Sequence, residues 1–300
     1  MKSMTRDTLV SYAFLAPAVL LLAAFTFYPM LYGAYLAFTE YNGARFGQGL
    51  PPKFIGLNNF YTLARDELFW TGLWNSLRYL LVVPVLQIAS LAVAVLVNRQ
   101  LPAITFFRGA YYVPVVTSIS LAAVMWEWVY NRDGTLNWLL KLLHVVQPNQ
   151  TFGWLDNPDT AFYAILFVTF WRGFGYYMVL YLAGLQSIPA ELEEAARLDG
   201  ATKWQVFWRI TVPMMRPTIL LCSLLSTIAA IRALEEVLVL TNGGPLNSTY
   251  TALMYVYSKA FQGFNFDYGL ASAAGLIVAL VALILSVINF RFFRDSGAHS

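Results

Sequence analysis

The residues of this chain best suited to do chemistry are ionisable side chains inside long apolar segments. Arg172 falls midway along the segment 160–186, and Arg232, Glu235 and Glu236 fall in the segment 217–241. A charge inside a membrane-sized apolar segment is costly, so such a residue is a candidate for function by default. Helical spacing predicts that one face of the first segment carries Thr169, Arg172, Gly173 and Tyr176.

The second charged segment predicts an opposing face of small side chains. Its candidate residues are Ser226, Ala229, Ala230 and Ala233, with Glu236 on the continuation of that face. A rise of about 1.5 Å per residue places Arg172 level with residues 228–230. A small, weakly polar face opposite threonine, arginine and tyrosine leaves room for a polar ligand. The alternative is that the alanines only let two helices pack closely.

The charged residues have alternatives of their own. Arg172 either contacts a ligand or forms a buried ion pair that serves the cavity. Arg232 lies one turn from Glu235 and Glu236, and we expect it to pair with one of them. Glu127, like these two glutamates, lies nearer the outer end of its segment, and no role is assigned to it.

The rarity of sulfur and imidazole ligands excludes several enzyme classes. The chain has one cysteine, Cys222, and two histidines, His144 and His299, too few for an intrachain disulfide or a cysteine- or histidine-based metal centre. It also contains no G-x-x-x-x-G-K-S/T phosphate loop. We therefore predict no catalytic residue, no metal and no enzymatic activity.

The elements that must position these residues are membrane-spanning helices. Of the 300 residues, 59% are hydrophobic and 12% are charged, whereas an average soluble domain has about 45–50% apolar and about 25% charged residues. A helix needs about 20 mostly apolar residues to cross the hydrocarbon core. Six segments qualify. Three lie between charged residues, namely Asp7 and Glu40, Arg78 and Arg99, and Arg108 and Glu127. Two cover residues 160–186 and 217–241, and the last lies between Asp267 and Arg291.

The sequence thus predicts an all-α membrane protein with six transmembrane helices. Its parts are an N-terminus (1–10), a first transmembrane helix (11–38), an outer loop (39–72), a core with the other five helices (73–293) and a tail (294–300). Six crossings place both termini on one side, together with the loops near 98–108 and 186–217. That side holds ten basic residues against seven on the other, which places both termini in the cytoplasm.

The inner loop 186–217 is more elaborate than a connection requires. Ser187 is a candidate N-cap, Pro189 suits a first helical turn, and acidic residues follow near the positive end of the helix dipole. Gly200 is expected to end this helix, and a second helix would run from 202 to 210 and lead to Pro213. Two short amphipathic helices favour either docking to a soluble partner or a position on the membrane surface.

This loop resembles a known motif. Glu194-Ala195-Ala196, three residues, Gly200, nine residues and Ile210-Thr211-Val212-Pro213 resemble the EAA loop of permeases in binding-protein-dependent ATP-binding-cassette (ABC) importers, E-A-A-x3-G-x9-I-x-L-P. Val212 in place of leucine is the only departure. Segments 184–189, 199–201 and 241–245 are similar to the maltose and glycerol-3-phosphate branch, and the resemblance extends from residue 11 to residue 294.

The resemblance implies the type I ABC importer permease (MetI-like) fold and a subunit without its own ATP chemistry. By family, two ATPase subunits, which would hold ATP and magnesium, bind two related permeases, and an extracellular binding protein delivers the solute. Glu194 would meet a basic residue of the ATPase, Gly200 would allow the turn, and Pro213 would fix the return into the membrane. The residues implied in coupling are Glu191, Glu194, Ala195, Ala196, Asp199, Gly200, Ile210 and Pro213.

The resemblance also implies a place for the substrate. The faces around Trp171-Arg172-Gly173 and upstream of 241–245 match sugar-contacting stretches of the maltose permease, although the identities differ here. We therefore expect the two faces named above to bind a sugar that enters through the plasma membrane of a bacterium or archaeon. The alternatives are an anionic solute such as glycerol-3-phosphate, which Arg172 favours, and an ion-coupled secondary transporter.

Overall fold

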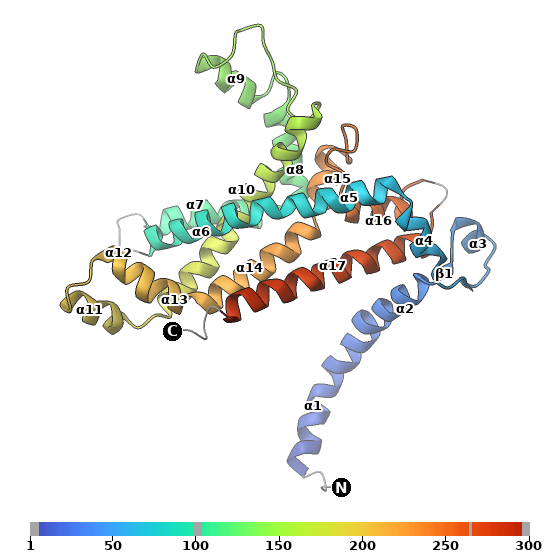
Figure 1. The fold of residues 1–300 in the computed structure, drawn as a ribbon, viewed down its shortest axis with the longest axis horizontal. Helices are drawn as coiled ribbons and strands as arrows, with labels where there is room; N and C mark the ends of the chain where they lie inside the picture. The colour runs from blue at the N-terminus through green and yellow to red at the C-terminus, as the bar shows by residue number, and fades with distance from the viewer. Residues whose placement is uncertain (1–5, 99–103, 264–265, 296–300) are drawn as a thin grey trace. The chain divides into compact units, whose positions relative to one another are not determined.

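The computed structural model describes residues 6–98, 104–263 and 266–295, and within these ranges the chain is mostly helical (Figure 1). It comprises two compact units. The first combines Met1–Asp66 with Val256–Ile277, and the second combines Glu67–Tyr255 with Val278–Ser300. Helices α16 (Ala252–Phe261) and α17 (Tyr268–Asp295) therefore contribute residues to both units.

The first unit begins with a helical rod made of α1 (Arg6–Leu22), a π-helical turn (Ala23–Phe27) and α2 (Tyr28–Leu36). Strand β1 (Thr39–Glu40) then pairs with β2 (Lys53–Phe54) in an antiparallel sheet, beside the short helices α3 (Gly43–Gly47) and α4 (Asn58–Ala64). The Asn59 amide donates hydrogen bonds to the carbonyls of Ala37 at 3.0 Å and Thr39 at 2.9 Å. These bonds fold the predicted outer loop back onto the end of α2.

The second span begins well before Arg78, inside the region that the sequence assigns to the outer loop. Helix α5 (Glu67–Arg78), a 3-10 turn (Tyr79–Leu81) and α6 (Val82–Val97) form one span of 31 residues. The helix accommodates Arg78 because its guanidinium lies 4.2 Å from the centre of the Phe162 ring and its Nη1 donates to Asn75 Oδ1 at 3.2 Å. A charge that is satisfied in this way does not mark the end of a span.

The third predicted span is bent rather than straight. Among the described residues, five helices are long and apolar enough to cross a membrane. The sixth span exists if Gly109–Val116 and Ile119–Leu142, which meet at 105°, count as one. Here α7 (Ile104–Val116) ends and α8 (Ile119–Tyr130) begins at Ser118, whose hydroxyl accepts a hydrogen bond from Leu121 N at 3.2 Å. The capping serine starts a new helix inside an apolar run, and α9 (Thr135–Leu142) completes the bent pair.

The fifth predicted span is interrupted, whereas the fourth is continuous. Helix α10 (Pro158–Gln186) has 29 residues without a break. In contrast, α14 (Arg216–Ile231) and α15 (Glu235–Leu240) are separated by residues 232–234. The Thr251 hydroxyl donates to the Ala233 carbonyl at 2.8 Å, which satisfies a backbone group that the break frees from the helix. The single continuous face predicted from Ser226 to Glu236 is therefore wrong.

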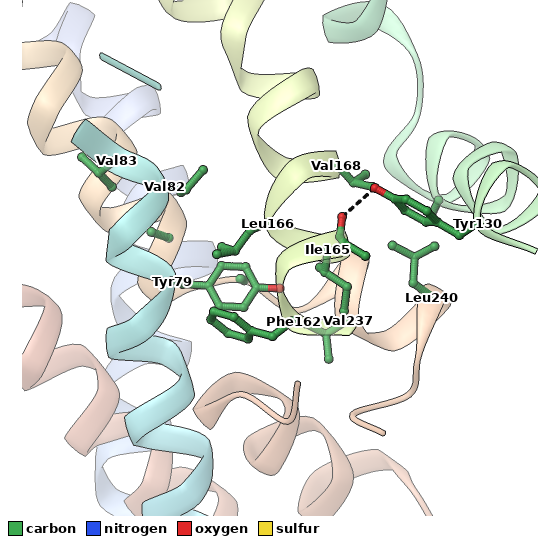
Figure 2. Close-up of a cluster of buried hydrophobic side chains, with 14 residues drawn as sticks. Tyr79, Val82, Val83, Tyr130, Phe162, Ile165, Leu166, Val168, Val237 and Leu240 are labelled. Atoms are coloured by element: carbon green, nitrogen blue, oxygen red, sulfur yellow. Dashed lines mark hydrogen bonds between the residues drawn. The ribbon is translucent and has the colours of Figure 1, made fainter. Parts of the chain in front are cut away.

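A hydrophobic cluster in the second unit holds these helices together. Figure 2 shows side chains from the Tyr79–Leu81 turn, α6, α8, α10 and α15 meeting, with the ring centres of Tyr79 and Phe162 5.3 Å apart in an edge-to-face contact. The Tyr130 hydroxyl donates to the Ala164 carbonyl at 2.9 Å. Between membrane helices, such van der Waals packing and hydrogen bonding provide the association energy. The cluster therefore fixes α10 against α15, the two helices that carry Arg172 and Glu236.

Candidate functional site

A cavity of 760 Å³ lies between α10 and the α14–α15 pair in the second unit. Apolar side chains such as Val82, Leu86 and Ile119 form much of its wall, and a few polar and charged groups interrupt them. This combination is typical of a small-molecule site. The structure brings all nine predicted substrate residues to this wall, namely Thr169, Arg172, Gly173, Tyr176, Ser226, Ala229, Ala230, Ala233 and Glu236.

The central polar feature of the cavity is an ion pair between α10 and α15. Arg172 Nη1 lies 3.9 Å from Glu236 Oε1, and the two side chains are 38% and 9% exposed. This distance is too long for a direct hydrogen bond. In the described part of the chain, the buried Arg172 Nε also has no hydrogen-bond partner. The pair is therefore loose, and the arginine keeps unused donor capacity.

Arg232 does not take the partner predicted for it. It lines the cavity with Glu235, and both side chains are exposed. Across the residues that the structure describes, Arg232 forms no salt bridge, and Glu236 pairs with Arg172 instead. The prediction is wrong because α14 ends at Ile231, so that one-turn helical spacing does not apply across the break. The cavity wall consequently holds two cations and two anions, whose formal charges cancel.

The alanine face both packs and lines the cavity. Ala230 and Ala233 belong to the buried hydrophobic cluster and also contribute to the cavity wall, whereas Ala229 is exposed. The two interpretations left open by the sequence therefore hold together. Small side chains let the helices approach closely and leave space beside the Arg172–Glu236 pair.

Gln87 of α6, which was not among the predicted site residues, supports the cavity wall. Its Nε2 donates to Ser226 Oγ at 2.8 Å and to the Cys222 carbonyl at 3.3 Å, while its Oε1 accepts a hydrogen bond from the Tyr181 hydroxyl. Gln87 thereby ties Ser226 on α14 to Tyr181 on α10. An amide inside the mostly apolar run 82–97 is the signal that could have identified it.

The loop between α10 and α14 forms a second candidate site. It contains α11 (Ala190–Leu198), α12 (Lys203–Val206), a π-helical turn (Phe207–Thr211) and α13 (Val212–Met214), grouped at the ends of α10 and α14 (Figure 1). No residue of α11 is buried, and Leu198 is 89% exposed. Of the predicted coupling residues, Glu191, Glu194, Ala195, Asp199 and Gly200 are exposed, and Ala196, Ile210 and Pro213 are half-buried.

The turn between the two loop helices lies at the predicted glycine. Gly200 has φ +84°, and Ala201 N donates to the Ala196 carbonyl at 2.9 Å. A left-handed glycine with such a bond is a common helix ending. Helix α12 then opens with a capping box, in which Thr202 Oγ1 accepts from Gln205 N and Gln205 Oε1 accepts from Thr202 N at 2.8 Å.

Two predicted details of this loop are wrong. Ser187 caps the end of α10, where its hydroxyl donates to the Gly184 carbonyl at 2.7 Å, and Pro189 is the N-cap of α11. The helical region is disfavoured for Ile188 because a proline follows it. A helix therefore does not begin at Ile188, next to Ser187, and α11 begins only after Pro189. The second helix also does not end before Pro213, since the π-helical turn leads into α13 and Pro213 occupies a first-turn position that needs no N–H partner.

Glu193 joins the two parts of the loop, and it was not among the predicted coupling residues. Its Oε2 lies 3.3 Å from Arg197 Nη2 within α11, and its Oε1 accepts a 3.5 Å hydrogen bond from Thr211 in the π-helical turn. The i, i+4 pair could be predicted from the sequence, whereas the contact across the turn could not. Together these contacts tether α11 to the segment that leads into α14.

Helices long and apolar enough to cross a membrane surround a largely apolar cavity with a few charged groups, and a folded helical loop joins two of them. This arrangement is expected of a membrane transport protein. The sequence matches the family of binding-protein-dependent transport system inner membrane components over residues 44–295. The chain belongs to this family, so it is a multi-pass membrane permease of the ABC importers and not an enzyme.

Two relatives and one solved structure illustrate the similarity. A probable ABC transporter permease of Pyrococcus horikoshii is 32% identical over 283 residues, covering 93% of this chain and 94% of the relative. The lactose transport system permease of Rhizobium radiobacter is 32% identical over 286 residues, covering 94% of this chain and 93% of the relative. One chain in the crystal structure of a bacterial alginate ABC transporter in complex with its alginate pentasaccharide-bound periplasmic protein has a TM-score of 0.81 and 24% identity, and the match covers 98% of this chain and 96% of that one. The predicted type I importer permease fold is thereby confirmed.

Proposed function

We propose that this chain forms, with a second homologous permease, the path by which an ABC importer carries a sugar into the cell. The observation that carries this proposal is the 760 Å³ cavity, where Arg172, Glu236 and Ser226 supply polar groups among apolar side chains. Convergent polar groups on an apolar wall suit a sugar, which has hydroxyls at its edges and apolar C–H faces. The lactose specificity named for one relative supports the same substrate class.

The energy for transport would come from two ATPase subunits that hold ATP and magnesium. The exposed α11, with Glu194 and Leu198 at its surface, offers a helix that a groove in an ATPase could grip. Because Glu193 ties α11 to the π-helical turn that leads into α14, a movement of α11 would reach the helix beside the cavity. ATP binding and hydrolysis would then shift the permease between outward-open and inward-open states.

This mechanism requires the loop to lie in the cytoplasm, on the same side as both termini. The excess of basic residues on that side, ten against the six that remain on the other once Arg78 is placed inside the second span, supports this orientation. The sugar would arrive on the opposite side with an extracellular binding protein.

Reconstitution tests this function directly. The chain would be co-expressed with its partner permease and ATPase, and the complex would be placed in proteoliposomes with the partner binding protein. Radiolabelled glucose, lactose, maltose, trehalose or glycerol-3-phosphate would then be supplied. The proposal predicts ATP-dependent uptake of at least one neutral sugar, and none when ATP or the binding protein is omitted. Uptake by the lone chain in a proton or sodium gradient, or uptake of glycerol-3-phosphate alone, would contradict it.

A further inference from the structure

The loose geometry of the Arg172–Glu236 pair bears on which sugars the cavity accepts. At 3.9 Å the two groups attract each other without a direct hydrogen bond, and the buried Arg172 Nε is unpaired in the part of the chain that the structure describes. Buried polar groups normally have partners. Because the two groups share no hydrogen bond, the partly exposed Arg172 guanidinium keeps donor capacity and the Glu236 carboxylate keeps acceptor capacity, side by side at the cavity wall.

Only one common kind of sugar substituent matches both halves of this pair. A hydroxyl group both donates and accepts, so neighbouring hydroxyls can accept from Arg172 and donate to Glu236. A carboxylate or phosphate only accepts, so it would pair with the arginine while leaving Glu236 facing a like charge. Such a desolvated like-charge contact is a strong means of rejecting a wrong ligand.

The remaining charges at the cavity do not favour an anion either. Arg232 and Glu235 both line the wall and are exposed, so the second cation is accompanied by a second anion. The wall carries no net formal charge, and an anionic solute would gain no overall attraction there. Without Glu236, however, Arg172 would be an uncompensated guanidinium, which is a favourable partner for a carboxylate.

We propose that Glu236 is the specificity-determining residue of this site. Together with Arg172, Glu236 selects neutral sugars and rejects anionic ones. The inference rests on the proposed function and adds the substrate class, since Arg172 alone would favour an anionic solute. Glu236 acts by accepting hydrogen bonds from sugar hydroxyl groups and by neutralising the charge of Arg172.

The test measures equilibrium binding to the assembled transporter in nanodiscs, without the binding protein, so that the cavity alone selects. The probes are radiolabelled glucose, lactose and maltose and their carboxylate counterparts glucuronate, lactobionate and maltobionate. The wild-type complex should bind a neutral probe at least about tenfold more tightly than its anion, a difference of about 1.4 kcal/mol. Glu236→Gln should reduce this preference about tenfold or reverse it, mainly by improving binding of the anion.

Two variants control for general damage to the site. Glu235→Gln removes the same charge from the same wall without releasing Arg172, so its shift in preference should be clearly smaller. Arg172→Gln/Glu236→Gln removes both charges and should weaken neutral binding without gaining anion binding. A Glu236→Gln complex with unchanged preference would overturn the inference while leaving sugar transport intact. A wild-type complex that binds no neutral probe would contradict the proposed function itself.

Discussion

Replacement of Gly200 should weaken coupling in a graded order, because its backbone is left-handed. Its φ is +84°, and a Cβ placed there has no heavy atom within 4 Å, so the cost is conformational and not steric. An ordinary L-residue in this region costs about 1–2 kcal/mol. Asparagine tolerates it better, and a β-branched residue tolerates it worse. The expected severity therefore increases from Gly200→Asn through Gly200→Ala to Gly200→Val.

The location of Gly200 determines what this cost does. Helix α11 has no buried residue, so the strain should distort the turn without unfolding the second unit. A cost of 1–2 kcal/mol corresponds to about a 5–30-fold loss in the population of the native turn. That factor is the expected upper limit for the fall in ATP-driven uptake by Gly200→Ala.

The assay compares sugar uptake with ATP hydrolysis in proteoliposomes that contain equal amounts of assembled complex. Uptake per ATP should fall in the order given above. Gly56→Ala is the matched control, because Gly56 has φ +62° and open space around it but lies in the predicted outer loop. Wild-type coupling in a fully assembled Gly200→Val complex would refute this reasoning, as would an equal loss in Gly56→Ala.

Three further predictions test the cavity and the loop. Gln87→Leu removes the hydrogen bonds to Ser226 and Tyr181. Because a hydrogen bond between membrane helices contributes about 0.6–1.7 kcal/mol, the Kd for the sugar, measured by equilibrium binding, should rise about 3–20-fold. Ser90→Ala, which loses only a bond to the Phe174 carbonyl, should leave that Kd unchanged. Gly175→Ala places a Cβ against the Tyr111 carbonyl oxygen and should cost about 1–3 kcal/mol, which a thermal unfolding assay would register as a lower Tm. In Gly173→Ala the nearest atom to the new Cβ is a Leu86 methyl carbon at 3.2 Å, at the end of a side chain that can move, so an equal loss in both variants would contradict the packing. Thr202→Ala removes the capping box and should destabilise α12 by about 1 kcal/mol, which limited proteolysis would detect as faster cleavage of the loop. An unchanged cleavage rate would show that the cap does not hold α12.

The elements that the sequence predicted well depend on local pattern. Helix α10 could be predicted because a single charge, Arg172, interrupts its long apolar segment, and the periodicity of Thr169, Arg172 and Tyr176 then identified the face that lines the cavity. The turn at Gly200 could be predicted for a similar reason, since only glycine adopts a φ of +84° at little cost.

The details that failed depend on contacts between distant residues. The break after Ile231 is supported by Thr251, which lies on a later part of the chain, and this break decides that Glu236 pairs with Arg172 and not with Arg232. The early start of the second span likewise depends on the Phe162 ring beside Arg78. No local periodicity contains that information.

If force from ATP hydrolysis enters this chain through α11, that helix must contact the ATPase in the assembled transporter. The most direct test places the photo-crosslinker p-benzoylphenylalanine at Leu198, which is 89% exposed on α11, and irradiates the assembled transporter in membranes. We expect an adduct with the ATPase subunit, and none from the same probe at the exposed Trp138 of α9. An adduct with the extracellular binding protein from position 198, or no ATPase adduct in a transporter that is active before irradiation, would contradict it.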